Sequence, residues 1–177
     1  IHQPTSEIVL NAIELDITSA QIAEGSGSSK QATIALDASL QRCHLTFATP
    51  LSPGTWKLTI AFCGTLNDKL RGFYRSTYKD ERGTIHNMAA TQFEATDARR
   101  AFPCWDEPDF KAVFATTLAI DPTLTAVSNS RITSETLTGG RKVVCYADTM
   151  KMSTYLVAFI VGRIEPTEPV MIGNTPL

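Results

Sequence analysis

Gln92 and Glu94 are two polar side chains separated by one residue, a spacing that would let them act together. Residues i and i+2 of a β-strand point to the same side of the sheet, so both side chains could reach one point in space. A carboxylate is a strong acceptor for a charged donor, and an amide oxygen adds a second acceptor. The chemistry that this pair suggests is the binding of a cationic group. Taken alone, however, the pattern is more typical of a solvated strand face.

The three histidines, His2, His44 and His86, do not form a metal-binding pattern. None has a second histidine four residues away, so the His-Glu-x-x-His motif that places two imidazoles on one face of a helix is absent from this sequence. His44 lies in an alternating apolar segment, where a structural role is expected. We therefore expect no catalytic zinc in this chain.

The four cysteines are irregularly spaced and none belongs to a Cys-x-x-Cys pair, which argues against a zinc ribbon or a dithiol redox site. Their even number would permit two disulfides, but a chain of 177 residues can bury a core without them. Three of the four lie in apolar, strand-like segments, so we expect buried free thiols and a reducing compartment. The four residues are Cys43, Cys63, Cys104 and Cys145.

The composition is that of a globular domain and argues against several kinds of partner. Hydrophobic residues make up 43% of the chain and charged residues 19%, which suits one domain with a substantial core. The net charge of −2, with scattered basic residues, gives no electrostatic footprint for nucleic acid. No apolar run approaches the roughly 20 residues of a membrane-spanning helix. Since no signal peptide is visible, we expect a cytoplasmic protein.

The segments that must position these residues follow a period of two, which indicates β-strands rather than amphipathic helices. Turn-forming residues separate the strands in the manner of a sandwich or a large curved sheet. The sequence thus predicts an all-β fold built on antiparallel strands. A single helical turn is expected at 96–102, before Pro103, and a hairpin turn at Gly139 and Gly140. The predicted strands cover 8–10, 13–17, 31–36, 43–47, 56–62, 113–120, 142–146 and 155–161.

Residues 71–114 depart from the alternating pattern and hold much of the polar, aromatic and turn-forming variety of the chain. They include the run TQFEATDARRAFPCWDEP at 91–108. This run resembles the hallmark of the N-terminal domain in zinc aminopeptidases related to puromycin-sensitive aminopeptidase. The resemblance extends to GTLND at 64–68, GFYRS at 72–76 and KMSTYLVAF at 151–159, which follow in the order of the family.

The resemblance implies that residues 1–177 form the saddle-like N-terminal β domain of an enzyme that removes single residues from peptide N-termini. In the family, this domain packs against a thermolysin-like catalytic domain, which holds the zinc and would lie outside this chain. Gln92 and Glu94 match the Gln-x-Glu pair whose side chains hold the free α-amino group of the substrate. An ammonium group offers three donors, so Glu94 would neutralise its charge and Gln92 would accept a further hydrogen bond.

The neighbours of this pair are expected to build the scaffold rather than to touch the ligand. We expect the arginines to pair with the acidic residues, and the tryptophan to pack beneath the turn. The residues concerned are Arg99, Arg100, Trp105, Asp106 and Glu107.

Further expectations concern the chain by itself. Because it lacks the zinc motif, we expect neither bound catalytic zinc nor turnover. The expected partners are peptide N-termini and the catalytic domain of the same protein, and not nucleic acid or a membrane. Family members carry an opening pair of strands before the segment equivalent to residues 5–10. The lack of that pair here predicts an unpaired sheet edge and a tendency to associate.

Two other interpretations stay open on the sequence alone. A β-sandwich module that binds carbohydrate or protein explains the composition but not the ordered motifs. It predicts a groove lined by exposed aromatic side chains, whereas Trp56 and Trp105 lie in segments that we expect to be buried. A relative that serves as an inactive scaffold, or one with epoxide hydrolase activity, would share the motifs. Sequence from the catalytic domain would separate these possibilities.

Overall fold

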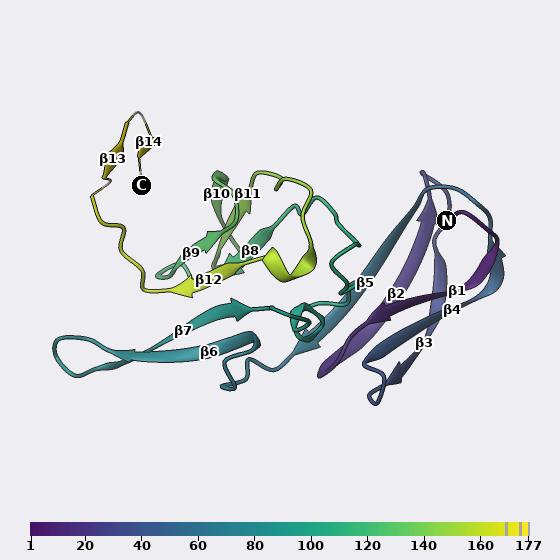
Figure 1. Ribbon diagram of the computed structural model, residues 1–177, viewed down its shortest axis with the longest axis horizontal. Coiled ribbons are helices and arrows are strands. Elements are labelled where there is room, and N and C mark those ends of the chain that lie inside the picture. Colours follow the sequence, from purple (N-terminus) through teal and green to yellow (C-terminus); the bar gives the residue numbers. More distant parts are fainter. Residues whose placement is uncertain (169, 174, 177) are drawn as a thin grey trace.

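The computed structural model describes residues 1–168, 170–173 and 175–176 and shows an elongated domain made of β-strands (Figure 1). In this part of the chain, the only helical elements are two single turns of 3₁₀ helix. The predicted all-β fold is confirmed. No helix among the described residues is long and apolar enough to cross a membrane.

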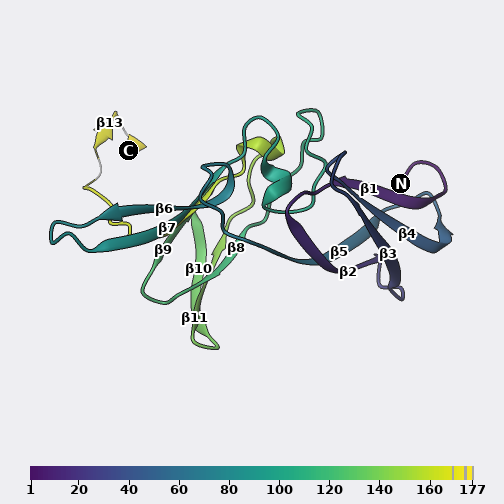
Figure 2. The ribbon, with the colours of Figure 1, turned by 90° about the horizontal axis from the view of Figure 1, so that it is seen from below.

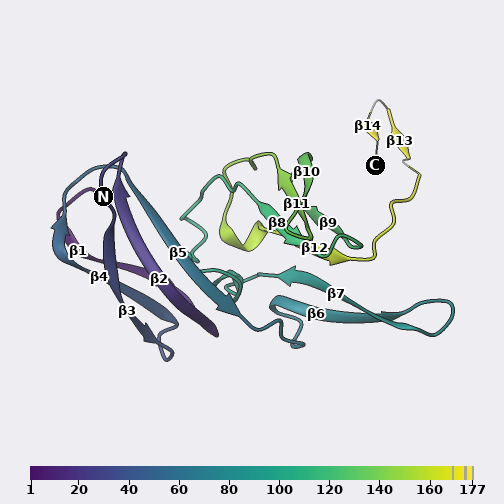
Figure 3. The same cartoon turned by 180° about the vertical axis from the view of Figure 1, so that it is seen from behind.

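The N-terminal half is one strongly curled antiparallel sheet (Figures 1 and 3). Strands β2 and β5 pair along the whole of β2, whereas β2 and β3 pair only at Gln21 with Gln31 and at Ile22 with Lys30. This short pairing lets the sheet bend sharply between β2 and β3. The strands, in their order across the sheet, are β1 (Thr5–Asn11), β4 (Arg42–Leu51), β3 (Lys30–Asp37), β2 (Leu15–Glu24) and β5 (Trp56–Gly64).

The alternation of the sequence explains which face of this sheet is buried. In β4, Cys43, Leu45 and Phe47 point into the apolar core, and the residues between them do not. The inward residues of β2 join the same core. Among the described residues, strands β1 and β5 form the two edges of the sheet. Self-association of the chain through such an edge stays a prediction.

The C-terminal half contains two smaller sheets and a short terminal hairpin (Figure 1). The hairpin of β10 and β11 projects away from the rest of the domain (Figure 2). One sheet has the order β6 (Gly72–Lys79), β7 (Ile85–Gln92), β12 (Phe159–Gly162) and β9 (Thr125–Ser128). The other has the order β10 (Ile132–Thr138), β11 (Arg141–Tyr146) and β8 (Thr117–Ile120), and the terminal hairpin joins β13 (Met171–Ile172) to β14 (Thr175–Pro176).

The segment after β7 connects the two halves. Asn11, the last residue of β1, exchanges two backbone hydrogen bonds with Cys104, with N···O distances of 2.7 and 3.1 Å. A second isolated bridge joins Ala112 to Met152. Two 3₁₀ turns, η1 (Ala98–Arg100) and η2 (Thr154–Leu156), lie in this region. A small core fills the junction; its buried members are Phe93, Ala98, Cys104, Met152 and Val157.

Several elements differ from the sequence-based expectation. The period-two pattern did not predict the strands β6, β7, β9 and β10, which carry polar residues on both faces or are short. All seven residues of β10 are exposed, so no hydrophobic alternation marks it. The helical turn before Pro103 and the hairpin turn at Gly139 and Gly140 are confirmed.

The cysteines are all free, as expected, but their burial varies. Cys43 and Cys104 are buried, and Cys145 is half-buried. The expectation of burial is wrong for Cys63, which is exposed near the end of β5. The cause is that β5 is an edge strand whose last four residues are all exposed, despite their apolar sequence.

Candidate functional site

Gln92 and Glu94 lie where β7 ends, at the junction between the two halves of the domain (Figure 1). Gln92 is the last residue of the strand, and Glu94 begins the turn that follows, so the two do not share one strand as expected. Both are exposed, and Phe93 between them is only 2% exposed. The alternation of a strand therefore continues through Glu94. No hydrogen bond within the described residues engages either side chain, so both can accept from a ligand.

Phe93 fixes the backbone between the two candidate residues. Its ring packs edge-on against Phe102, with ring centroids 5.8 Å apart, and against Phe159, at 6.1 Å. Edge-to-face pairs of this kind contribute about 0.5–1.5 kcal/mol beyond simple burial. Because Phe93 points into the core, its two neighbours in sequence point outward.

The turn after Glu94 is closed by the backbone. The N–H of Asp97 donates to the carbonyl oxygen of Phe93 at 2.9 Å, and η1 begins at the next residue. The Glu94–Ala95 peptide bond within this turn is cis. The Asp97 side chain does not cap η1 but accepts a hydrogen bond from Arg100 Nε at 2.7 Å.

Asp106 is a buried carboxylate that joins three parts of the junction. Its Oδ2 accepts from Arg99 Nε at 3.0 Å, and its Oδ1 accepts from the Thr154 hydroxyl at 2.6 Å. Its own N–H donates to the side-chain oxygen of Asn11 at 3.1 Å. The expected pairing of arginines with acids is confirmed for Arg99 with Asp106. Arg100 instead pairs with Asp97 and Glu14, and no ion pair within the described residues engages Glu107.

Trp105 differs from the expectation. It is 47% exposed rather than packed beneath the turn. Its indole N–H donates to the carbonyl oxygen of Val9 at 2.9 Å, which turns the ring outward to stack on Phe110 with centroids 6.2 Å apart. Both rings line a mainly apolar groove that also contains Trp56. Such a groove is what the binding-module interpretation predicted, and the expectation of burial at Trp105 was wrong.

The histidines are engaged by single carboxylates. His44 Nδ1 lies 2.9 Å from Glu7 Oε1, across the pairing of β4 with β1. His86 Nε2 lies 2.9 Å from Asp80 Oδ2. Among the described residues, no group of three or more His, Cys, Asp or Glu side chains is arranged to hold a metal ion.

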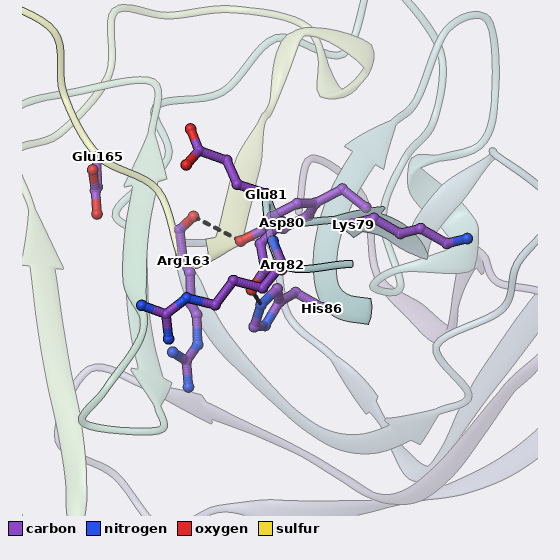
Figure 4. A pocket seen from close by; sticks show the side chains of 8 residues that line it. Lys79, Asp80, Glu81, Arg82, His86, Arg163 and Glu165 are labelled. Carbon is purple, nitrogen blue, oxygen red and sulfur yellow. Dashed lines mark hydrogen bonds and ion pairs between the residues drawn. The ribbon is translucent and has the colours of Figure 1, made fainter. Parts of the chain in front are cut away.

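A hollow lies at the tip of the β6–β7 hairpin, the end opposite Gln92 (Figure 4). Asp80 shapes this tip: it accepts from the N–H groups of Arg82 and Thr84 at 2.9 and 2.8 Å. Its contact with His86 and these backbone bonds hold the pKa of Asp80 below the usual 3.8. The lining carries charges of both signs and consists of Tyr78, Lys79, Asp80, Glu81, Arg82, His86, Arg163 and Glu165.

The fold and the site together define a class of protein: an all-β domain that presents a pair of exposed acceptors at a strand end. The family described as Peptidase M1 N-terminal domain matches residues 1–156. The chain therefore belongs to the family of peptidase M1 N-terminal domains.

Curated relatives agree with this assignment. The chain is 45% identical over 168 residues to the puromycin-sensitive aminopeptidase of Caenorhabditis elegans, covering 93% of this chain and 18% of that protein. It is 45% identical over 168 residues to aminopeptidase M1 of Arabidopsis thaliana, covering 93% and 19%. It is 42% identical over 189 residues to the mitochondrial aminopeptidase 2 of Saccharomyces cerevisiae, covering 99% and 19%. The chain thus spans about a fifth of the length of the curated relatives it matches.

Proposed function

We propose that this chain is the substrate-anchoring domain of a zinc-dependent aminopeptidase and that Gln92 and Glu94 bind the free α-amino group of peptide substrates. One observation carries the proposal. Both side chains are exposed on either side of the buried Phe93, and neither makes a hydrogen bond within the described residues. The chain belongs to a family whose matching relatives are named aminopeptidases. The chain would then supply recognition, and the rest of the protein would supply chemistry.

The two side chains suit an ammonium ligand. The three N–H donors of a peptide α-ammonium can be shared between the Glu94 carboxylate and the Gln92 amide oxygen. Charge-assisted hydrogen bonds of this type are roughly twice as strong as those between neutral groups. An internal peptide segment brings no ammonium and would forgo these charge-assisted hydrogen bonds. The pair would therefore select chain ends.

The zinc belongs to the parent enzyme in this proposal. Bound zinc would polarise the scissile carbonyl and activate water. Since the described residues here offer no ligand set, the metal would be held by the catalytic domain, which is also the proposed partner of this domain. Four free cysteines suit a reducing compartment and support a cytoplasmic location.

The isolated 177-residue chain is proposed to be inactive. We expect zinc analysis of the purified chain to give far less than one ion per molecule, and an aminoacyl-anilide assay to show no turnover. Stoichiometric zinc together with turnover would contradict the proposal for the isolated chain.

Mutation of Glu94 tests the binding role in the full-length protein. Glu94→Gln keeps the shape of the side chain but removes its charge, so we expect a higher KM for aminoacyl substrates and a lower kcat. Glu107→Gln is the matched control, because Glu107 is an exposed glutamate of the same motif whose side chain has no hydrogen bond within the described residues. The proposal fails if both variants behave as the parent enzyme does.

A further inference from the structure

We propose that Arg100 is a positioning residue that fixes Gln92 and Glu94 relative to each other; this inference rests on the proposed function. Arg100 ends η1, six residues after Glu94. It does not belong to the exposed pair, since its side chain is only 6% exposed. Instead, Arg100 contacts the turn that holds Glu94 and the strand residue that pairs with Gln92.

The support of Glu94 is the turn that starts at this residue. The far end of the turn is Asp97, whose N–H closes the turn onto Phe93 O at 2.9 Å. Arg100 Nε donates to Asp97 Oδ1 at 2.7 Å, the shortest kind of contact that a charged N–H···O pair makes. Arg100 therefore holds the end of the turn from which Glu94 projects.

The support of Gln92 is its partner on the neighbouring strand. Gln92 pairs with Gly72, the first residue of β6. A Cβ atom on Gly72 would lie 2.8 Å from the Cβ of Arg100, so the arginine stem packs directly on the Gly72 backbone. Gly72 also has φ +68°, a conformation that favours glycine. The same side chain thus buttresses the strand residue opposite Gln92.

Arg100 is itself held in place from the other half of the domain. Its Nη1 lies 2.8 Å from Glu14 Oε2, so the guanidinium bridges two carboxylates. This contact with the Arg100 guanidinium holds the pKa of Glu14 below its usual value. A planar guanidinium can make both contacts at once, which a lysine ammonium on a flexible stem does less well.

This support matters because two acceptors must meet one small ammonium group. Binding constellations need placement within about 0.5 Å, and a misplacement of about 1 Å can cost about 100-fold. Gln92 and Glu94 lie on different elements, a strand and a turn. Arg100 touches both supports, so its loss should separate the two acceptors without removing either.

The experiment measures discrimination for the amine in the full-length protein. Inhibition constants are determined for an amino acid amide and for its desamino analogue, which keeps the side chain and amide but lacks the α-amino group. We expect Arg100→Gln to reduce the ratio of the two constants about tenfold or more, and Arg100→Lys to reduce it less. A merely structural role would lower the fraction of active enzyme but leave this ratio unchanged.

Three further variants make the result decisive. Gly72→Ala should displace Arg100 and also reduce the ratio, which covers the case that Arg100→Gln does not fold. Arg141→Gln, at an exposed arginine in β11, should keep the parent ratio. A parent-like ratio in the folded Arg100 and Gly72 variants, with a reduced ratio in Glu94→Gln, would overturn the role of Arg100 alone. A parent-like ratio in Glu94→Gln would overturn the proposed function and this inference with it.

Discussion

The hydroxyl group of Thr154 donates a hydrogen bond of 2.6 Å to the buried carboxylate of Asp106, 48 residues earlier in the chain. This contact joins the segment after β7 to the segment before β12. Arg99 carries the charge opposite to that of Asp106, with its Nε atom 3.0 Å from Asp106 Oδ2. Two of the sequence motifs that mark the family, at 91–108 and 151–159, therefore meet at one buried carboxylate. The candidate site is built on the backbone that this cluster supports.

Thr154→Val tests the energetic weight of this contact. The substitution keeps the shape of the side chain but leaves one oxygen of a buried carboxylate without its donor, so we expect a loss of about 1–3 kcal/mol in the free energy of unfolding. Thr123→Val is the matched control, because Thr123 donates to Asp121 at the same 2.6 Å on an exposed turn. Denaturant titration of both variants should show a clearly smaller loss for the control; equal losses would contradict the role assigned to Asp106.

Gly72→Ala tests the close packing of Arg100 on β6. The new methyl group would meet the Arg100 Cβ at 2.8 Å, in addition to the strain of a residue with φ +68°. Gly83→Ala has similar strain, with φ +80°, but nothing lies within 4 Å of its Cβ. Each should lose about 1 kcal/mol to strain, and Gly72→Ala should lose more. Equal melting temperatures for the two variants would show that the contact is not tight.

The hairpin tip should respond to acid through Asp80. Its pKa is lowered below 3.8, chiefly by its hydrogen bond to His86. A carboxyl group with a lowered pKa contributes stability above its unfolded value, and this contribution is lost as the pH falls through the folded pKa. An NMR titration should give Asp80 a value below 3.8, and His86→Phe should raise it. A parent value at or above 3.8 would contradict this account.

Thiol reactivity should follow burial rather than sequence context. Burial raises the pKa of the Cys43 thiol, and burial together with the charge of Asp106 raises that of Cys104. Cys63 is exposed, so a thiol reagent should label it well before those two in the folded chain. Mass spectrometry after brief labelling identifies the modified site. Cys63→Ser should remove the rapid phase, and rapid labelling of Cys104 would show that the junction opens.

The sequence predicted those strands whose faces differ in polarity. In β4, the alternation of Cys43, Leu45 and Phe47 with polar residues reports directly on one buried face. The β10 strand has no buried face in the structure, so no pattern in its residues could mark it. The β6 strand mixes aromatic and polar residues, and neither β6 nor β7 keeps a strict alternation of buried and exposed residues.

The sequence predicts which residues form the candidate site, but it predicts their arrangement in space only in part. The motif around Gln92 and Glu94 is recognisable in the sequence, whereas the end of β7 between them is not. The role of Thr154 could not be predicted, because its partner Asp106 comes close only through the tertiary fold. The outward rotation of Trp105 likewise depends on a hydrogen bond to Val9, 96 residues away in the chain.

The central claim is that Gln92 and Glu94 bind the substrate α-ammonium, and a crystal structure of the full-length protein with a bound amino acid amide tests it most directly. The account predicts the ligand ammonium nitrogen within about 3.2 Å of both the Glu94 carboxylate and the Gln92 amide oxygen. A ligand whose ammonium is bound by other residues, with Glu94 facing solvent, would contradict it.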